Sequence, residues 1–536
     1  MKRSKLFCSW ILLFVIQISG SHAEYSSIVV NDSTNNETNL LKNVLVNVLE
    51  QFVKDQAMKM GSIQDKLDAM NEKLLHCGTQ HSKHASLRPN SKNRTTRRRK
   101  YPITGAARKP NIASTSSVSS EGSRGKEFLL LFMANHYQVS GPVTVYITTE
   151  NNTSVNISTS SHLSGGIKSA TDRIMNVSSH SSIQLPFNLT CEYYTVETKA
   201  ILVQTSELST VTIFDSFYKT SNDGTLIIPA EKLATRYLVS STKPYYSGSK
   251  DYYSQFAVAA IHEKTKVKIK FRLKSNASIS LLGRTYRNEE VFTTSLNEYE
   301  TLQVGHTTDL TGTFIKSSKP IAVFSGNRCQ YLRFGTCSHM VTQLPPITEF
   351  DNKYIVPPFY GNSGTLIQVI SETQTSIDVT IGNEASTWYM KEKEFRKREV
   401  TSDEITILES NGAILVTGFG MGASFNDPYM TVIPGVHQYI DYYKVVVTDG
   451  YTYNYICVII PNEFAKDLQI NGSSFDYYKT VRLSSAVLDT SFSIRLIEVN
   501  SGPVEVSTTN NSKFGLIVYG HRYDDGYAFA GKVILS

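Results

Sequence analysis

The sequence predicts a mainly β fold of tandem antiparallel repeats, preceded by an N-terminal coiled-coil helix. From about residue 126, β-branched and aromatic runs alternate with turn residues, which is typical of β-strands. Similar runs recur along this region, which indicates internal repeats. Earlier, between residues 38 and 77, apolar residues are spaced alternately by three and four, as on one face of a helix.

The β repeats fall into two alternating series. The first contains PIAVFSG (320–326), AILVTGF (413–419) and GLIVYGH (515–521), with AILVQTS (200–206) before them. The second runs FLLLFMAN, QFAVAAIH, TLIQVISE and NYICVIIP. One unit cannot bury a face alone, so we expect neighbouring units to share a core in sandwich-like repeats. The alternative is a propeller-like closed arrangement, because the domain begins on one series and ends on the other, so that its first and last strands complete one unit.

Residues 1–23 predict a secretory signal peptide, followed by a polar lead over 24–37. Basic residues precede an apolar run that is too short to span a bilayer comfortably, and Ser21-His22-Ala23 fits a cleavage site. A membrane anchor is the alternative. We expect a secreted, extracellular protein without a membrane span, in an oxidising compartment.

Sequons for N-glycosylation agree with export, and each occupied one must face water. There are eleven: Asn31, Asn36, Asn93, Asn151, Asn152, Asn156, Asn176, Asn188, Asn276, Asn471 and Asn510.

The helix over 38–77 carries a heptad seam, which predicts a homo-oligomer. Gln56 on the seam and Gly61 beside it weaken the helix. The alternative is one amphipathic helix that packs on its own domain. The seam residues are Val46, Leu49, Val53, Gln56, Met60, Ile63, Leu67, Met70, Leu74 and Cys77.

Residues 78–125 predict a flexible linker that is rich in Ser and basic side chains. Residues 88–109 hold nine positive charges and no acidic residue, so the rest of the mature chain is mildly acidic and nucleic acid is not an expected partner. A furin-type pattern predicts proteolytic processing here. Two alternatives stay open, a patch for sulfated glycans or acidic surfaces and a solvated basic run. The processing residues are Arg94, Arg97, Arg98, Arg99 and Lys100.

Five cysteines remain after signal cleavage. We expect a short disulfide between Cys329 and Cys337, contributing roughly 2–4 kcal/mol, and a second pairing of Cys191 with Cys457. Alternatively, Cys457 is a buried thiol, since it lies in the apolar run NYICVII. Cys77 is left over and predicts an interchain disulfide, because it continues the heptad seam at a d position.

No catalytic residue, cofactor or metal site is expected. His339 lies near Cys337, but a disulfide fits a secreted chain better than a metal pair. Asp524 and Asp525 are adjacent, so on one strand they point to opposite faces and cannot form a glycosidase pair. GFGMGA (418–423) lacks the following helix that a dinucleotide loop needs.

Three long blocks carry a family resemblance: SQFAVAAIHEKTKVKIKF, DLTGTFIKSSKPIAVFSGNRCQYL and CSHMVTQLPPITEFDNKYIVPPF. Together they resemble the IgGFc-binding protein N-terminal domain family over about residues 126–536. The resemblance implies a secreted, non-enzymatic binding or mucosal-barrier protein, here expected as a stand-alone member without von Willebrand D-type assemblies. It supplies no residue-level Fc-binding motif.

The expected function is multivalent recognition of glycan or glycoprotein surfaces, in innate defence or associated with mucus. Several β domains on flexible linkers would strengthen weak single-site binding through avidity. A structural matrix or mucus component is the first alternative, and a secreted hydrolase the second. Within the β domain, the stretch from Cys329 to Pro346 is interpreted as a stapled structural loop, with a binding loop as the alternative.

Overall fold

The computed structural model describes residues 122–136, 143–215, 221–247, 250–333, 336–475, 480–484 and 492–535. All of them belong to the second of two compact units, Ser114–Ser536. The predicted signal peptide, polar lead, coiled-coil helix and basic stretch lie outside these residues. In the part that is described, no helix is long and apolar enough to cross a membrane.

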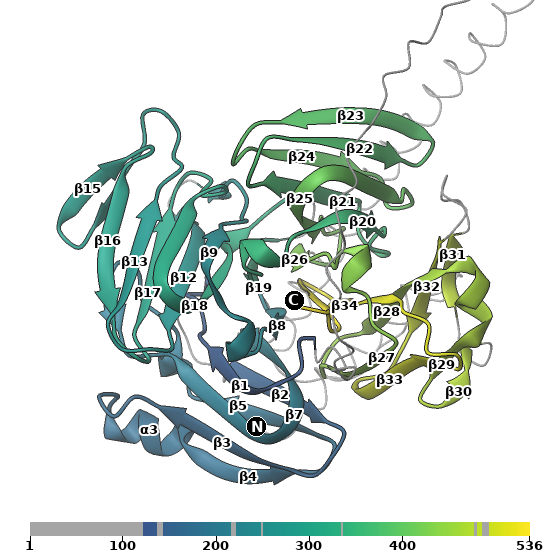
Figure 1. Ribbon diagram of the computed structural model, residues 1–536, viewed down its shortest axis with the longest axis horizontal. Coiled ribbons are helices and arrows are strands. Elements are labelled where there is room, and N and C mark those ends of the chain that lie inside the picture. The colour runs from purple at the N-terminus through teal and green to yellow at the C-terminus, as the bar shows by residue number, and fades with distance from the viewer. Residues whose placement is uncertain are drawn as a thin grey trace, which may run out of the picture. The chain divides into compact units, whose positions relative to one another are not determined.

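The described chain forms four successive antiparallel sheet units, which confirms the mainly β prediction (Figure 1). The first contains β1 Gly125–Leu130, β2 Val143–Thr149, β3 Thr153–Thr159, β4 Arg173–Val177, β5 His180–Leu185, β7 Ile201–Asp215 and β8 Asp223–Ile227, with helix α3 Gly165–Thr171. The second contains β9 Ala234–Leu238, β12 Ser254–Ala260, β13 Thr265–Lys270, β16 Val291–Leu296, β17 Thr301–His306, β18 Phe314–Gln330 and β19 Ser338–Gln343, and β6 Val196–Glu197 joins its edge.

The third and fourth units continue this order. The third contains β20 Asp351–Val356, β21 Thr365–Ser371, β22 Thr375–Ile381, β23 Glu384–Met390, β24 Phe395–Val400, β25 Thr406–Gly420 and β26 Tyr429–Val432. The fourth contains β27 Tyr442–Val447, β28 Tyr453–Pro461, β29 Leu468–Ile470, β30 Ser473–Ser474, β31 Thr480–Ser484, β32 Phe492–Glu498, β33 Gly502–Thr508, β34 Gly515–Arg522 and β35 Asp525–Ala530. Small hairpins are β10 Tyr246–Ser247 with β11 Lys250–Asp251, and β14 Ser278–Leu281 with β15 Arg284–Arg287. The 3₁₀ turns are η1 Phe187–Leu189, η2 Ala230–Lys232, η3 Ile347–Glu349, η4 Val436–Gln438 and η5 Asn462–Asp467.

One long strand organises each of the first three units. In the third unit, residues 406–410 of β25 pair with β22 and most of β20, whereas residues 414–420 pair with β21 and β26. β7 and β18 divide their partners in the same way. In the fourth unit the long strand is replaced by two strands, β33 and β34. Each of the first three units is therefore a curled sheet whose two halves have different partner strands, whereas the fourth consists of two sheets.

The burial pattern follows the residue pattern of each strand. β13, TKVKIK, alternates buried apolar residues with exposed lysines, as expected for a strand with one solvated face. β12, SQFAVAA, and β21, TLIQVIS, are buried at every position, because another sheet packs on their second face.

Apolar cores are shared between consecutive sheets in a closed cycle. The core of the first sheet takes in Ala257 and Phe324 of the second, and that of the second takes in Leu415 of the third. The core of the third takes in Ile517 of the fourth, and that of the fourth takes in Phe214 of the first. This cyclic packing joins the four units into one body of curled antiparallel sheets.

Two repeat assignments were wrong in the first unit. AILVQTS lies mainly in the first half of β7, whereas the strand half equivalent to the other three segments is 209–215. FLLLFMAN includes the end of β1, whereas the equivalent of β12 and β21 is β2. Apolar runs of this length look alike without their pairing partners.

The first and last strands do not complete one sheet, because β1 pairs with β7 and β35 pairs with β34. The segments beside them close the cycle instead. The Ser123 backbone N–H donates to the Val533 carbonyl at 2.7 Å, and the Val533 N–H donates to Ser123 Oγ at 3.0 Å.

Candidate functional site

A single carboxylate joins the four sheets where β8, β19, β26 and β35 meet. Asp223 is fully buried and accepts one backbone N–H from each of these strands, at 2.9–3.2 Å. Burial raises the pKa of Asp223 well above its usual range, and the backbone N–H bonds act in the opposite direction. The donors are Gly224, Val341, Met430 and Ala528. This polar centre holds the inner strands in a fixed register.

Loops at one end of these strands are tied together in the same cyclic order. The Thr336 N–H and hydroxyl donate to the Asp427 carboxylate, which joins the second unit to the third. The Asp524 N–H donates to the Phe425 carbonyl at 3.0 Å, which joins the third to the fourth. The Asn222 N–H donates to Asp525 Oδ1 at 2.9 Å, which joins the fourth to the first. We call this end the loop face; it comprises residues 133–136, 221–222, 240–245, 252–253, 331–333, 336–337, 357–364, 421–428, 448–453 and 521–525.

Exposed aromatic side chains gather on the loop face. Five of the nine large apolar side chains that are exposed in the described part of the chain lie there. Phe425 and Tyr523 are each 70% exposed, and their ring centroids lie 6.4 Å apart. The other three are Tyr331, Tyr360 and Tyr453. The remaining four, Ile174, Leu282, Val291 and Tyr389, lie on outer strands and turns of the sheets.

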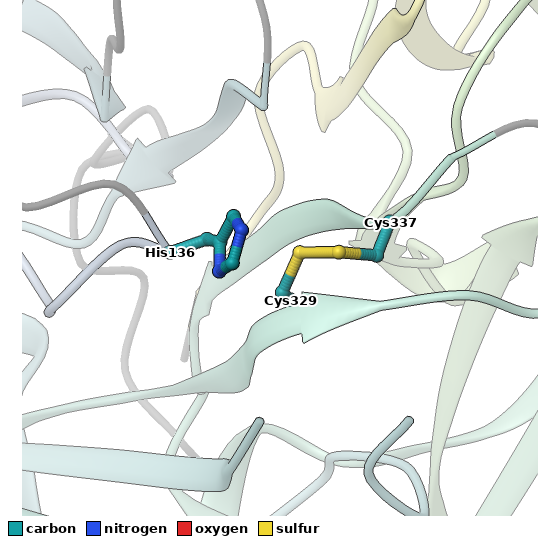
Figure 2. Close-up of side chains that lie close together, drawn as sticks. All are labelled: His136, Cys329 and Cys337. Atoms are coloured by element: carbon teal, nitrogen blue, oxygen red, sulfur yellow. A yellow bond between two sulfur atoms is a disulfide. The ribbon is translucent and has the colours of Figure 1, made fainter. Parts of the chain in front are cut away.

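The predicted disulfide between Cys329 and Cys337 forms at the edge of the loop face, where β18 gives way to its following loop. His136, from the segment after β1, lies beside the sulfur pair (Figure 2). Its ring packs edge-on against Tyr252 at 4.6 Å, and Tyr252 stacks on Tyr245. Cys329 is fully buried, whereas Cys337 is partly exposed.

Buried ionisable groups lie on the loop face. Burial raises the pKa of Asp525 to about 6, and the Arg522 guanidinium, 2.7 Å from its Oδ2, acts in the opposite direction. Burial lowers the pKa of His521 to about 4, and its buried Nε2 has no hydrogen-bond partner among the described residues. Gly361, at φ +83°, approaches this ring so closely that a Cβ would lie 2.4 Å from Nε2.

The second predicted disulfide does not form. Cys191 and Cys457 are buried free thiols that belong to the cores of the first and third sheets respectively, so they line different apolar clusters. Burial raises the pKa of both thiols to about 12, which keeps them protonated and unreactive. The alternative of a buried thiol is correct for Cys457.

The histidine next to Cys337 in sequence does not join the sulfurs. His339 points inward, where its Nε2 lies 2.9 Å from Asp215 Oδ2. Asp524 and Asp525 were interpreted as a solvated turn, which is wrong for Asp525. Asp524 lies in the turn before β35, but Asp525 begins β35 and is buried in the network described above.

All eight described sequons have their asparagine at least partly at the surface: Asn151, Asn152, Asn156, Asn176, Asn188, Asn276, Asn471 and Asn510. Asn31, Asn36 and Asn93 lie outside the described residues, as do Cys77 and the processing residues Arg94, Arg97, Arg98, Arg99 and Lys100.

Three features of the site were missed by sequence reasoning. Asp223 looks like a turn residue in SNDG, and His136 lies far along the chain from the cysteines it approaches. The aromatic residues of the loop face come from separate loops. A signal that could have been found is the recurrence of a turn after each long strand, with Tyr331, Phe425 and Tyr523 in corresponding loops.

Comparison with known proteins identifies the family. The model of the IgGFc binding protein family matches residues 223–520, which is more than half of the chain. This chain belongs to that family. The matched range runs from β8 to β34 and includes Asp223, the disulfide and most of the loop face. The family is named for binding rather than for catalysis.

A relative from Homo sapiens, the IgGFc-binding protein, is 28% identical over 322 residues. The match covers 58% of this chain but only 6% of the human protein.

Among solved structures, a Ca²⁺-stabilised, ice-binding adhesin of an Antarctic bacterium matches 77% of this chain and 99% of its own, with 9% identity and a TM-score of 0.10. The major pilin protein T3.2 of Streptococcus pyogenes matches 77% and 98%, with 8% identity and a TM-score of 0.12. These scores are too low to support a fold argument.

Proposed function

We propose that this chain is a secreted, non-enzymatic recognition protein that binds a glycoprotein surface through its loop face. The observation that carries the proposal is the gathering of Tyr331, Tyr360, Phe425, Tyr453 and Tyr523 on that face. Membership of a binding family supports it. Exposed sequons agree with an extracellular setting in innate defence or mucus.

The loop face has the physical properties of a binding surface. Aromatic side chains supply large contact area at a low cost in conformational entropy, and they dominate the binding energy of many interfaces. The hydrogen bonds that Asp427, the Phe425 carbonyl and Asp525 accept hold the loops in place before a ligand arrives. Such preorganisation lowers the entropy cost of association.

Multivalency is the second part of the proposal. The heptad seam over 38–77 would pair chains, and Cys77 would lock them covalently. Avidity would then strengthen weak single-site binding by about 10²–10⁴. We expect a disulfide-linked oligomer on non-reducing gels that becomes a monomer in Cys77→Ser. A wild-type chain that sediments as a monomer without reductant would leave the helix as an amphipathic segment of its own domain.

The binding test uses a panel of immobilised glycans, mucus glycoproteins and immunoglobulin Fc, followed by capture from native secretions. The double variant Phe425→Ala/Tyr523→Ala should lose at least about tenfold in affinity for whichever ligand binds, because it removes two neighbouring anchors. The matched control is Tyr389→Ala, since Tyr389 is 73% exposed but lies on β23. Equal affinities for the double variant and the control would contradict the proposal, and turnover in a hydrolase screen would contradict its non-enzymatic part.

A further inference from the structure

The cluster of His136, Cys329 and Cys337 carries an inference beyond recognition. One donor atom from each residue lies within 4.8 Å of the other two (Figure 2). We propose that reduction of the Cys329–Cys337 disulfide converts this cluster into a binding site for a soft divalent metal ion of the zinc type. The site lies at the edge of the loop face and does not depend on which ligand that face recognises.

Donor chemistry favours zinc over the harder cations. Two thiolates and one imidazole are the ligand types that Zn²⁺ prefers, with Zn–S distances of about 2.3 Å and Zn–N distances of about 2.0 Å. In a tetrahedral site of this size, neighbouring donor atoms lie about 3.5–3.8 Å apart. The three donors already lie within 4.8 Å of one another. The two sulfurs must separate after the disulfide breaks, and side-chain rotation is enough because the Cα atoms are 5.2 Å apart.

The surroundings of the cluster suit a three-ligand site that keeps one open position. Cys329 is fully buried at the end of β18 and provides a fixed anchor, whereas Cys337 and His136 are half-buried and accessible to a metal ion. The Tyr252 hydroxyl lies 3.5 Å from His136 Nε2, and its ring packs against the imidazole. Such neighbours orient histidine ligands in known metal sites. A water molecule would complete the tetrahedron.

A dithiol is the reductant that we propose for the Cys329–Cys337 disulfide. The dithiol supplies two electrons and two protons, so the S–S bond breaks, two thiols form and the dithiol becomes a disulfide. Metal binding then releases one proton from each thiol, since the thiolate is the ligand. Cys337 is partly exposed and provides the sulfur that an external thiolate can attack.

The test follows Co²⁺ absorption, which reports thiolate ligands directly. It uses the full chain in a Cys77→Ser background, so that the predicted interchain cysteine cannot compete. After reduction by a phosphine and its removal, we expect one Co²⁺ per chain with a thiolate-to-metal band, displaced by Zn²⁺, and no band from the oxidised chain. His136→Ala should weaken binding at least about tenfold, whereas His162→Ala, at an exposed histidine outside the cluster, should not.

Circular dichroism of the same samples shows whether the reduced chain is still folded. We expect the reduced chain to keep its β spectrum, because the disulfide closes only a short loop. Three outcomes would each overturn the proposal: unfolding on reduction, a reduced chain that shows no thiolate band, and a band that persists unchanged in Cys337→Ser or His136→Ala.

Discussion

At the scale of single residues, Asp223 connects four parts of the chain that are far apart in sequence. Its carboxylate accepts hydrogen bonds from four backbone N–H groups and donates none. The site therefore needs a side chain whose two terminal atoms both accept hydrogen bonds. Without it, backbone N–H groups of the inner strands would be buried and unpaired. An unpaired buried donor costs about 1–3 kcal/mol.

Asp223→Asn is expected to lower the free energy of unfolding by about 2–6 kcal/mol. Asparagine keeps the size of the side chain but replaces one oxygen by an NH₂ group, which faces N–H donors and leaves about two of them unpaired. Urea denaturation measures the loss. Asp378→Asn is the control, since Asp378 is exposed on β22 and its carboxylate accepts from the Thr387 hydroxyl. Equal losses in both variants would show that Asp223 has no special structural role.

The buried side chain of His521 should make the folded domain less stable in acid. Its pKa is about 4 in the folded domain, because burial disfavours the charged ring, against an ordinary value of 6.5. The unfolded state therefore takes up this proton between pH 6.5 and about 4 while the folded state does not, so the free energy of unfolding falls as the pH falls through that window. We expect this contribution to reach about 1–3 kcal/mol.

The variant His521→Gln should remove that part of the pH dependence. Asp525 has the opposite sign, because its folded pKa of about 6 lies above the ordinary 3.8 and acid favours its folded form. The informative quantity is thus the difference between wild type and His521→Gln, followed by urea denaturation from pH 7 to pH 4, with His162→Gln as control. A difference that is constant with pH would contradict the assignment.

At the scale of elements, a short link recurs between consecutive sheets. Each link has a 3₁₀ turn, then a strand whose tyrosine closes the link: Tyr237 in β9, Tyr354 in β20 and Tyr443 in β27. The tyrosine hydroxyl accepts the N–H of the residue three positions earlier and donates to a carbonyl in the middle of the long strand or at its break. For Tyr237 the carbonyl is that of Ile321, at 2.7 Å. Phe128 occupies the corresponding position of β1.

Tyr354→Phe should cost about 1–3 kcal/mol of stability without unfolding the domain. The change leaves the Asp351 N–H without an acceptor and the Ile414 carbonyl without a donor. The phenyl ring should still fit, since Phe128 fills the equivalent site. Thermal unfolding compared with Tyr389→Phe, an exposed tyrosine on β23, checks the effect. No measurable loss would mean that the hydroxyl does not hold the link.

Most strands and the short disulfide could be predicted from the sequence. The repeat assignments in the first unit and the candidate site could not, for physical reasons. β-Branched runs identified most strands, and the short spacing of Cys329 and Cys337 identified their disulfide. The repeat assignment was wrong in the first unit because AILVQTS resembles the later segments but pairs with different strands. The candidate site was not predicted, because the roles of His136 and Asp223 depend on contacts between segments that are distant in sequence.

At the scale of the whole β domain, cyclic packing explains why one end can serve as a binding surface. Each sheet contributes to the core of a neighbour, so the four units support one another. The inner strands β8, β19 and β26 lie between the sheets in Figure 1, and the hydrogen-bonded loops at their end form the loop face. A rigid scaffold that presents loops is a common arrangement for recognition.

Hydrogen exchange with mass spectrometry shows directly whether the loop face binds the ligand. The β domain is compared with and without the glycoprotein that binds best in the panel. We expect slower exchange in residues 357–364, 421–428 and 521–525, with the outer strands β16 and β23 unchanged. Slower exchange in β16 or β23, with the loop face unchanged, would contradict it.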